Sequence, residues 1–340
     1  MPIFLCDTAG MTRAQWLDCR MHGPDGDIPY TIGGSDVAAV FGVSPWTTPL
    51  ELWRVKKGLM QADEDANAAV KEMGNMMEPI VARCYAKATG NTVIEDTGLY
   101  QHAKYPWALA NLDYRVEEKG KQGVLEIKTT NYHKAGDWAE GLPYFYELQV
   151  RYYLAVMDLD FADVACMWGY NPETDMAIRR VYRNPDIEAD IFEKLGAFVL
   201  SLELDDPPDM YGVKPDLALA ALARIYGASK EGLPTVEFGA PQADGIRRIA
   251  VLQVEMKALQ DQQTQKEKEV DALSVQLAEI MKTHEHGVYE EPGKRYEVDF
   301  VTRVTRRADS KALKKDYPDV YAAVLRPSES RKIKIREVPV

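Results

Sequence analysis

The stretch from Ala110 to Thr130, A-N-L-D-Y-R-V-E-E-K-G-K-Q-G-V-L-E-I-K-T-T, predicts a β-hairpin. From Leu112 to Val116, apolar residues alternate with polar ones, which is the period expected of a half-buried strand. The polar segment from Glu117 to Gly123 contains two glycines and predicts the loop. An apolar run restarts at Val124, so the second strand is expected there.

Two charged residues, Glu126 and Lys128, interrupt the second apolar run, and alternation places both on one face of that strand. Asp113 is expected on the partner strand. Carboxylate oxygens suit a hard cation such as Mg²⁺, which one or two carboxylates and substrate phosphates usually hold. A lysine beside them can offset charge on a phosphate oxygen. A surface hairpin with a cross-strand ion pair is the other interpretation of these residues.

Helical segments on either side of the hairpin carry further polar residues. Glu78 lies upstream in the segment from Asn67 to Thr89, where Pro79 predicts a kink or a fresh start. Downstream, Gln149 and Tyr153 are four residues apart and therefore share one face of a helix. The order along the chain is helix glutamate, strand aspartate, strand E-x-K and helix Q-x-x-x-Y.

This order of motifs resembles the PD-(D/E)XK nuclease superfamily and, more narrowly, the YqaJ-like viral recombinases, the lambda-type exonucleases. The segment from Ile32 to Val40, I-G-G-S-D-V-A-A-V, is similar to the amino-terminal signature of that group, as are S-P-W and P-L-E-L-W after it. The tryptophans of these two motifs, Trp46 and Trp53, are expected to pack rather than to stack on bases. The resemblance covers residues 12 to 210.

In the family pattern an arginine lies a few residues before the glycine pair. Here Arg20 lies thirteen residues before Gly33, with an apparent insertion from Met21 to Thr31. Ser35 is the expected N-cap of a helix from Asp36 to Phe41, and a helix N-terminus favours anions. The resemblance implies that Arg20, Ser35 and Tyr153 bind the substrate, with Ser35 holding a terminal phosphate.

The resemblance implies an α/β fold, a restriction-endonuclease-like core in which helices flank a mixed sheet. It implies a metal-dependent deoxyribonuclease that degrades one strand of linear duplex DNA, 5′→3′, for phage-type recombination. Asp113, Glu126 and the Ile127 carbonyl would hold Mg²⁺ or Mn²⁺, and Glu78 would bind a second ion or its water. Lys128 would position the attacking water, and Gln149 would orient that water or the lysine.

The resemblance also bears on cofactors and partners. Duplex DNA ends are the expected substrate, and a single-strand annealing protein and further copies of the chain are the possible protein partners. The cysteines are expected to be free thiols, at positions 6, 19, 84 and 166. Relatives with an iron–sulfur cluster use three late cysteines, and none follows Cys166, so no cluster is expected.

Composition is typical of a globular protein, with 46% hydrophobic residues in a chain of 340. An apolar run of about 18 residues is absent and the start does not resemble a signal peptide, so we expect a cytoplasmic protein, in the host cytoplasm if phage-encoded, without membrane contact. The net charge is −12, yet residues 291 to 340 hold 13 Lys or Arg against 8 Asp or Glu. DNA binding follows local rather than total charge, so this segment is a candidate contact.

We expect an exonuclease domain over residues 1–210, a connector over 211–243, a long heptad helix over 244–282 and a basic segment over 283–340. The heptad seam steps by three and four from Ile249 to Ile280, with Gln263 and Lys266 as polar positions in its middle. Such a seam requires a partner helix, in this chain or in another copy.

Three alternative functions share these features. A restriction or repair endonuclease would have the same carboxylate cluster but would cut circular DNA. A DNA-binding or scaffold protein could keep the fold without catalysis, although Asp113, Glu126 and Lys128 together argue against lost catalysis. An interaction protein could depend mainly on its coiled coil.

Overall fold

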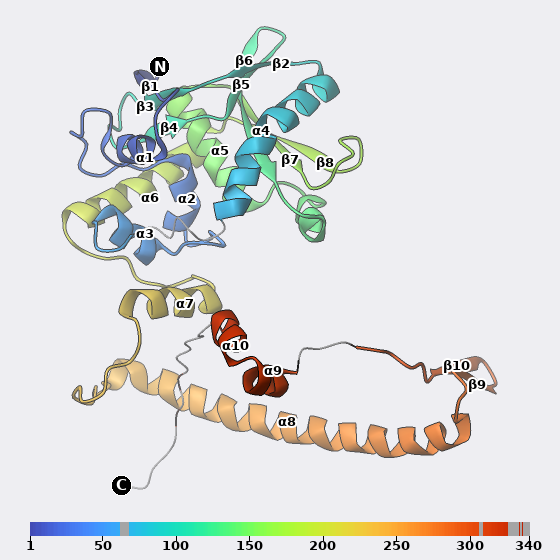
Figure 1. The fold of residues 1–340 in the computed structure, drawn as a ribbon. Helices are drawn as coiled ribbons and strands as arrows, with labels where there is room; N and C mark the ends of the chain where they lie inside the picture. Colours follow the sequence, from blue (N-terminus) through green and yellow to red (C-terminus); the bar gives the residue numbers. More distant parts are fainter. Residues whose placement is uncertain (62–67, 306–308, 326–332, 334, 336–340) are drawn as a thin grey trace. The chain divides into compact units, whose positions relative to one another are not determined.

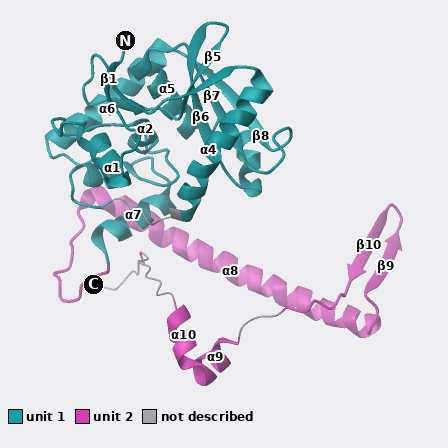
Figure 2. Cartoon of the chain, turned by 45° about the horizontal axis from the view of Figure 1, so that its top comes forward, with its two compact units in different colours: residues 1–227 teal, residues 228–340 magenta. Residues whose placement is uncertain are grey.

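The computed structural model describes residues 1–61, 68–305, 309–325, 333 and 335 (Figure 1). The chain divides into two compact units, Met1–Gly227 and Ala228–Val340 (Figure 2). The elements of the first unit are, in chain order, β1 (Ile3–Asp7), α1 (Arg13–His22), α2 (Gly34–Val40), α3 (Pro49–Lys56), α4 (Ala68–Thr89), β2 (Thr92–Glu95), β3 (Gly98–Gln101), β4 (Leu109–Asn111), β5 (Tyr114–Glu118), β6 (Lys121–Thr129), η1 (Tyr132–Trp138), α5 (Tyr144–Met157), β7 (Phe161–Met167), β8 (Met176–Tyr182), α6 (Pro185–Glu203) and α7 (Pro215–Tyr226).

The main sheet has the strand order β2-β5-β6-β7-β8. Strands β6 and β7 run parallel and the other neighbours run antiparallel, so the predicted mixed sheet is confirmed. Parallel neighbours require a crossover connection, which the helix α5 supplies. A second, antiparallel sheet has the order β1-β3-β4.

Helices cover both faces of the main sheet, with α4 on one side and α5 with α2 and α6 on the other (Figure 1). The alternation along β6 separates these two cores. Leu125 and Ile127 pack with residues of α4, whereas Val124 belongs to the core that contains α5. Glu126 lies between two residues of the α4 face, so its side chain is directed towards α5.

The central hairpin is confirmed, but its loop is shorter than predicted. Residues Lys119 and Gly120 form the turn, with φ angles of 51° and 81°, and Glu118 pairs with Lys121. Two residues with positive φ match the twist of a two-residue hairpin turn, so both strands extend into the predicted loop. Asp113 is not within the strand as predicted, because β5 begins one residue later, at Tyr114.

Two expectations about helix ends are corrected. α4 continues through Pro79 without a fresh start. A proline removes one backbone donor, and the packing of Val81 and Tyr85 against the sheet holds the helix together. The sequence also predicts a single last helix over residues 311–325. The structure instead has two short helices separated before Pro318, because the residue before a proline disfavours the helical conformation.

The second unit contains α8 (Ala240–Met281), the antiparallel hairpin of β9 (His286–Glu291) and β10 (Lys294–Asp299), α9 (Ser310–Asp316) and α10 (Pro318–Val324). Every residue of α8 from Val254 to Leu277 is exposed. Of the thirteen basic residues predicted as a DNA contact after residue 290, seven lie outside the described residues. The six that are described are balanced by six Asp or Glu.

Candidate active site

Glu126 lies at the centre of a buried polar cluster on β6. Its Oε1 accepts hydrogen bonds from Lys128 Nζ at 2.5 Å and from Gln149 Nε2 at 2.6 Å. The structure therefore confirms that Glu126 and Lys128 share a face of the strand, and it brings Gln149 of α5 to the same carboxylate. Only 2% of Glu126 is exposed, and its Oε2 is buried without a hydrogen-bond partner among the described residues. A buried carboxylate oxygen of this kind calls for a further ligand.

Two further carboxylates influence this cluster. Asp113 Oδ2 accepts a hydrogen bond from the Ile127 backbone amide at 2.8 Å, which fixes it beside β6. Burial, followed by repulsion from Asp113, raises the pKa of Glu126 to about 7. The same two causes raise the pKa of Glu78, on α4, to about 7. Three carboxylates thus share one poorly solvated region, where each additional negative charge is unfavourable.

Lys128 provides the positive charge of the cluster. Burial acts to lower its pKa, but the carboxylates of Glu126 and Asp113 outweigh burial and hold the Lys128 pKa above its ordinary value. Its ammonium group also lies 5.0 Å from the centre of the Tyr146 ring. Lys128 is therefore a permanent cation at the carboxylates, where it can attract a phosphate group.

The glycine pair connects this cluster to Arg20 and Ser35. A Cβ on Gly34 would lie 2.4 Å from the ring of Tyr153, and a Cβ on Gly33 would lie 2.7 Å from Arg20 Nη2. Only glycine allows both side chains to approach this closely. The Tyr153 hydroxyl oxygen in turn accepts a hydrogen bond from Gln149 Nε2 at 3.2 Å.

Ser35 is exposed on α2 and its Oγ accepts a hydrogen bond from Arg20 Nη2 at 2.9 Å. The prediction that Ser35 caps this helix is wrong. Gly33 is the N-cap, and its amide donates to Asp36 Oδ2 at 2.9 Å. Asp36 therefore takes the capping role that was predicted for Ser35. The Ser35 hydroxyl instead contacts Arg20, which precedes the Met21–Thr31 segment in the sequence.

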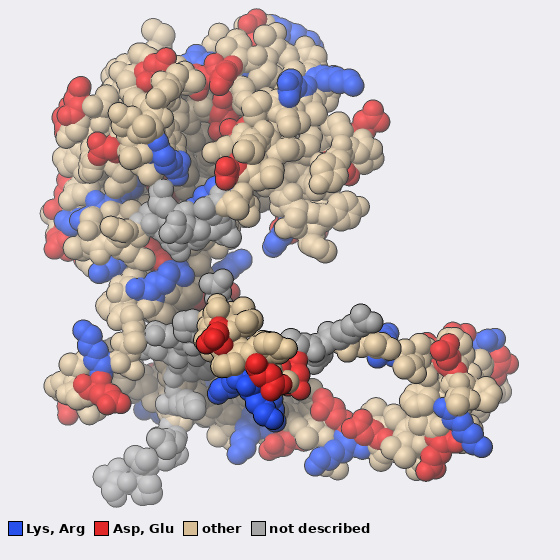
Figure 3. Space-filling view, viewed as in Figure 1, with Lys and Arg blue, Asp and Glu red and all other residues tan. Residues whose placement is uncertain are grey.

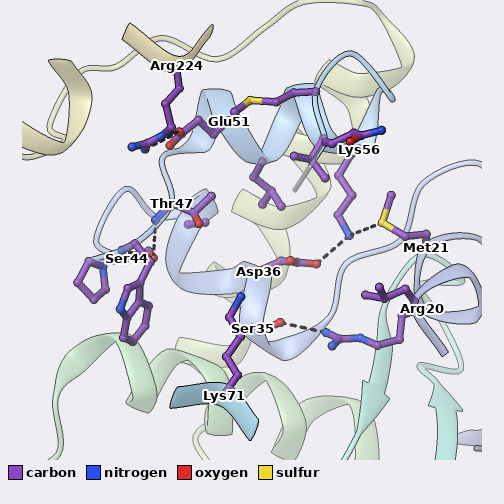
Figure 4. Close-up of a pocket in the computed structure, with 18 residues that line it drawn as sticks. Arg20, Met21, Ser35, Asp36, Ser44, Thr47, Glu51, Lys56, Lys71 and Arg224 are labelled. Carbon is purple, nitrogen blue, oxygen red and sulfur yellow. Dashed lines mark hydrogen bonds and ion pairs between the residues drawn. The ribbon is translucent and has the colours of Figure 1, made fainter. Parts of the chain in front are cut away.

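Two neighbouring cavities open at these residues. One, of about 540 Å³, is lined by Glu78, Ile127, Lys128 and part of α4. The other, of about 670 Å³, is lined by Arg20, Ser35 and residues of α3, and is drawn in Figure 4. Trp46 and Lys71 line both cavities. The volumes are those of small-molecule and nucleotide sites.

The described residues that line the larger cavity carry more positive than negative charge. Its lining contains four cations and two carboxylates, namely Arg20, Lys56, Lys71, Arg224, Asp36 and Glu51. Lys56 pairs with Asp36 at 2.9 Å, and Arg224 pairs with Glu51 at 2.6 Å (Figure 4). The excess of two positive charges suits an anionic ligand.

Residues 15–160 match the family model of the YqaJ-like viral recombinase domain. These residues form a YqaJ-like domain. A protein of Bacillus subtilis (strain 168), named uncharacterized protein YqaJ, is 27% identical over 341 residues, which cover 98% of this chain and 97% of that protein.

Solved structures similar to this chain include two exonucleases. The alkaline exonuclease LHK-Exo from Laribacter hongkongensis is 19% identical, with 57% of this chain and 94% of that chain covered and a TM-score of 0.47. The phage-related exonuclease from Haemophilus somnus 129PT is 12% identical, with 51% and 94% covered and a TM-score of 0.37.

Sequence reasoning missed several residues that line the cavities of the YqaJ-like domain. Lys71 lies seven residues before Glu78 on α4, a spacing of two turns that places both on one face and could have been noticed. Trp46 packs edge-on against Phe145, with 5.4 Å between the ring centres, yet 59% of it is exposed, whereas Trp53 is buried as expected. Nothing in the sequence around Trp46 distinguishes it from a packed aromatic.

Within the described part of the chain, no helix combines the length and apolar character that a membrane crossing requires.

Proposed function

We propose that the YqaJ-like domain is a divalent-metal-dependent exonuclease that degrades one strand of duplex DNA from its 5′ end. The observation that carries this proposal is the Glu126 carboxylate. It is buried, it is held through one oxygen by Lys128 and Gln149, and its second oxygen has no hydrogen-bond partner among the described residues. A nearby cavity contains Glu78 and Lys128, so a phosphodiester can reach this group of residues.

The residues fit a divalent metal that is shared with the substrate. Among the described residues, no three His, Cys, Asp or Glu side chains form a group that could hold a metal alone. Mg²⁺ needs only one or two carboxylates when waters and phosphate oxygens complete its shell. Asp113, Glu126 and the Ile127 carbonyl would hold Mg²⁺ or Mn²⁺, with Glu78 at a second ion. Bound metal would supply Lewis acidity at the phosphate.

The chain's own residues prepare this site. The Lys128 ammonium neutralises the carboxylates and can orient a water towards the scissile phosphorus. Gln149 fixes the orientation of Glu126 from α5. Tyr153 is buried, so it would not contact DNA. Its proposed role is to position Gln149 through the hydrogen bond to its hydroxyl.

The two adjoining cavities support the choice of an end-directed enzyme. Charged residues of both signs are interspersed on the face of the first unit drawn in Figure 3, so the net positive lining of the larger cavity is a local feature. A terminal 5′-phosphate at Arg20 and Ser35 would place the next phosphodiester towards the cavity that Glu78 and Lys128 line. Trp46 lines both cavities, where an exposed indole can stack on a terminal base.

The test is digestion of linear and covalently closed duplexes, labelled at either end, with and without Mg²⁺. We expect 5′→3′ digestion of linear DNA that requires the metal. Glu126→Gln removes one charged ligand but keeps the shape, and should slow cleavage by at least roughly 10²-fold while DNA is still bound.

The matched control is Glu118→Gln, on the same hairpin. Glu118 pairs with Arg180 at 2.7 Å and belongs to neither cavity, so its cleavage rate should remain that of the wild type. Wild-type cleavage by Glu126→Gln would contradict the assignment. Cutting of closed circles would instead identify an endonuclease.

A further inference from the structure

The helix α8 exposes a long apolar seam. Eight of its ten seam positions between Ile249 and Ile280 are apolar, and each of those eight side chains is at least 37% exposed. A seam of about 32 residues is roughly 48 Å long. Monomeric proteins rarely leave an apolar surface of this extent uncovered. The described tail residues Ile333 and Ile335 form backbone hydrogen bonds with the Gln253 side chain of α8, which is outside the seam.

The seam is symmetric about its midpoint between Thr264 and Gln265. Residues at equal distances from that point form matched layers, and each layer joins an a position to a d position, as in antiparallel coiled coils. The layers are Ile249 with Ile280, Leu252 with Leu277, Met256 with Leu273, Leu259 with Val270, and Gln263 with Lys266. Every apolar residue of the seam therefore meets an apolar residue when two copies pair antiparallel.

The two polar positions select the antiparallel orientation. In a parallel dimer in register, Lys266 would face Lys266 of the second copy, and like charges in a seam are unfavourable. In the antiparallel dimer, Lys266 faces Gln263 of the second copy. Gln263 donates through Nε2 to Glu267 at 2.9 Å, so its side-chain carbonyl oxygen can accept from the ammonium group.

We propose that α8 is the interface of an antiparallel homodimer, in which two copies of the seam from Ile249 to Ile280 pack about a two-fold axis at Thr264 and Gln265. A strip about 48 Å long and about 10 Å wide on each helix buries roughly 1,000 Å² in total. That area is near the lower limit for a specific interface, so the dimer dissociates on dilution. The interface is isologous and closes as a dimer.

Sedimentation equilibrium of the full chain over a concentration series tests the interface. We expect a monomer–dimer equilibrium in the wild type. Leu259→Asp buries an unpaired charge in two layers and should raise the dissociation constant at least roughly tenfold. Val254→Asp is the matched control, because Val254 is similarly exposed, at 71% against 63%, but lies on the opposite face of the helix. It should leave the dissociation constant unchanged.

The orientation has its own test. In the antiparallel dimer, Gln263→Glu places a carboxylate opposite Lys266 of the second copy. In a parallel dimer, the same carboxylate would face the identical carboxylate of the second copy. We therefore expect dimerisation to tighten roughly threefold to tenfold. Gln265→Glu makes the same change on the outer face and should have no effect. A monomer at all concentrations, equal effects of Leu259→Asp and Val254→Asp, or weaker dimerisation of Gln263→Glu would each overturn the proposal.

Discussion

Replacing Gly34 by alanine tests how closely the amino-terminal signature approaches the active site. The added Cβ would lie 2.4 Å, 2.5 Å and 2.8 Å from three atoms of the Tyr153 side chain. These distances are well inside van der Waals contact. Tyr153 is only 5% exposed and lies within α5, so its ring must move, and α5 or α2 must move with it.

The size of the effect follows from a comparison with a second glycine. A Cβ on Gly74, within α4, would lie 3.6 Å from Thr129 Oγ1, which is ordinary contact. Both variants gain the helix propensity of alanine, which is up to about 1 kcal/mol. Only Gly34→Ala adds overpacking, which typically lowers the free energy of unfolding by about 1–3 kcal/mol. We expect that difference between the two variants.

Denaturant unfolding of both variants measures the difference, and a cleavage assay measures its consequence. Movement of Tyr153 disturbs its 3.2 Å contact with Gln149, which orients Glu126. Loss of such a supporting contact typically lowers activity by roughly 10- to 100-fold. Equal unfolding midpoints for Gly34→Ala and Gly74→Ala would refute the close approach. Full activity in a destabilised Gly34→Ala would refute the connection to Gln149.

Three further predictions concern pH, base stacking and the DNA end. The pKa values of Glu126 and Glu78 are raised to about 7, so protons compete with a bound cation for these carboxylates below that pH. The Mg²⁺ affinity, measured by calorimetry, should therefore rise with pH up to about 7 and then level off. The metal-free folded protein also binds more protons than the unfolded chain between pH 4.5 and about 7, so its free energy of unfolding should fall as pH rises through that window. Trp46→Ala should weaken binding of DNA ends by roughly tenfold and Trp46→Phe much less, because stacking is worth about 1–3 kcal/mol per base; equal losses would exclude stacking. The wild type should degrade DNA ends that lack the 5′-phosphate more slowly than phosphorylated ends, and Arg20→Ala should remove that difference. An equal wild-type rate on phosphorylated and unphosphorylated ends would remove Arg20 and Ser35 from the site.

Local periodicity in the sequence was sufficient for the central elements. The period of two placed Glu126 and Lys128 on one face of β6, and the spacing of four placed Gln149 and Tyr153 on one face of α5. Both predictions are confirmed because a strand or helix fixes the direction of its own side chains whatever surrounds it. The seam of α8 is visible in the sequence for the same reason.

Only the tertiary structure decided which of those faces is covered and which distant segments meet. The burial of Glu126, and with it the raised pKa, depends on α5 packing over β6. The contact of Arg20 with Ser35 spans a segment whose path no local pattern predicts. Trp46 is exposed and lines both cavities, which form only where distant segments pack together. Periodicity describes one element at a time, whereas solvation and contact depend on how several elements pack together.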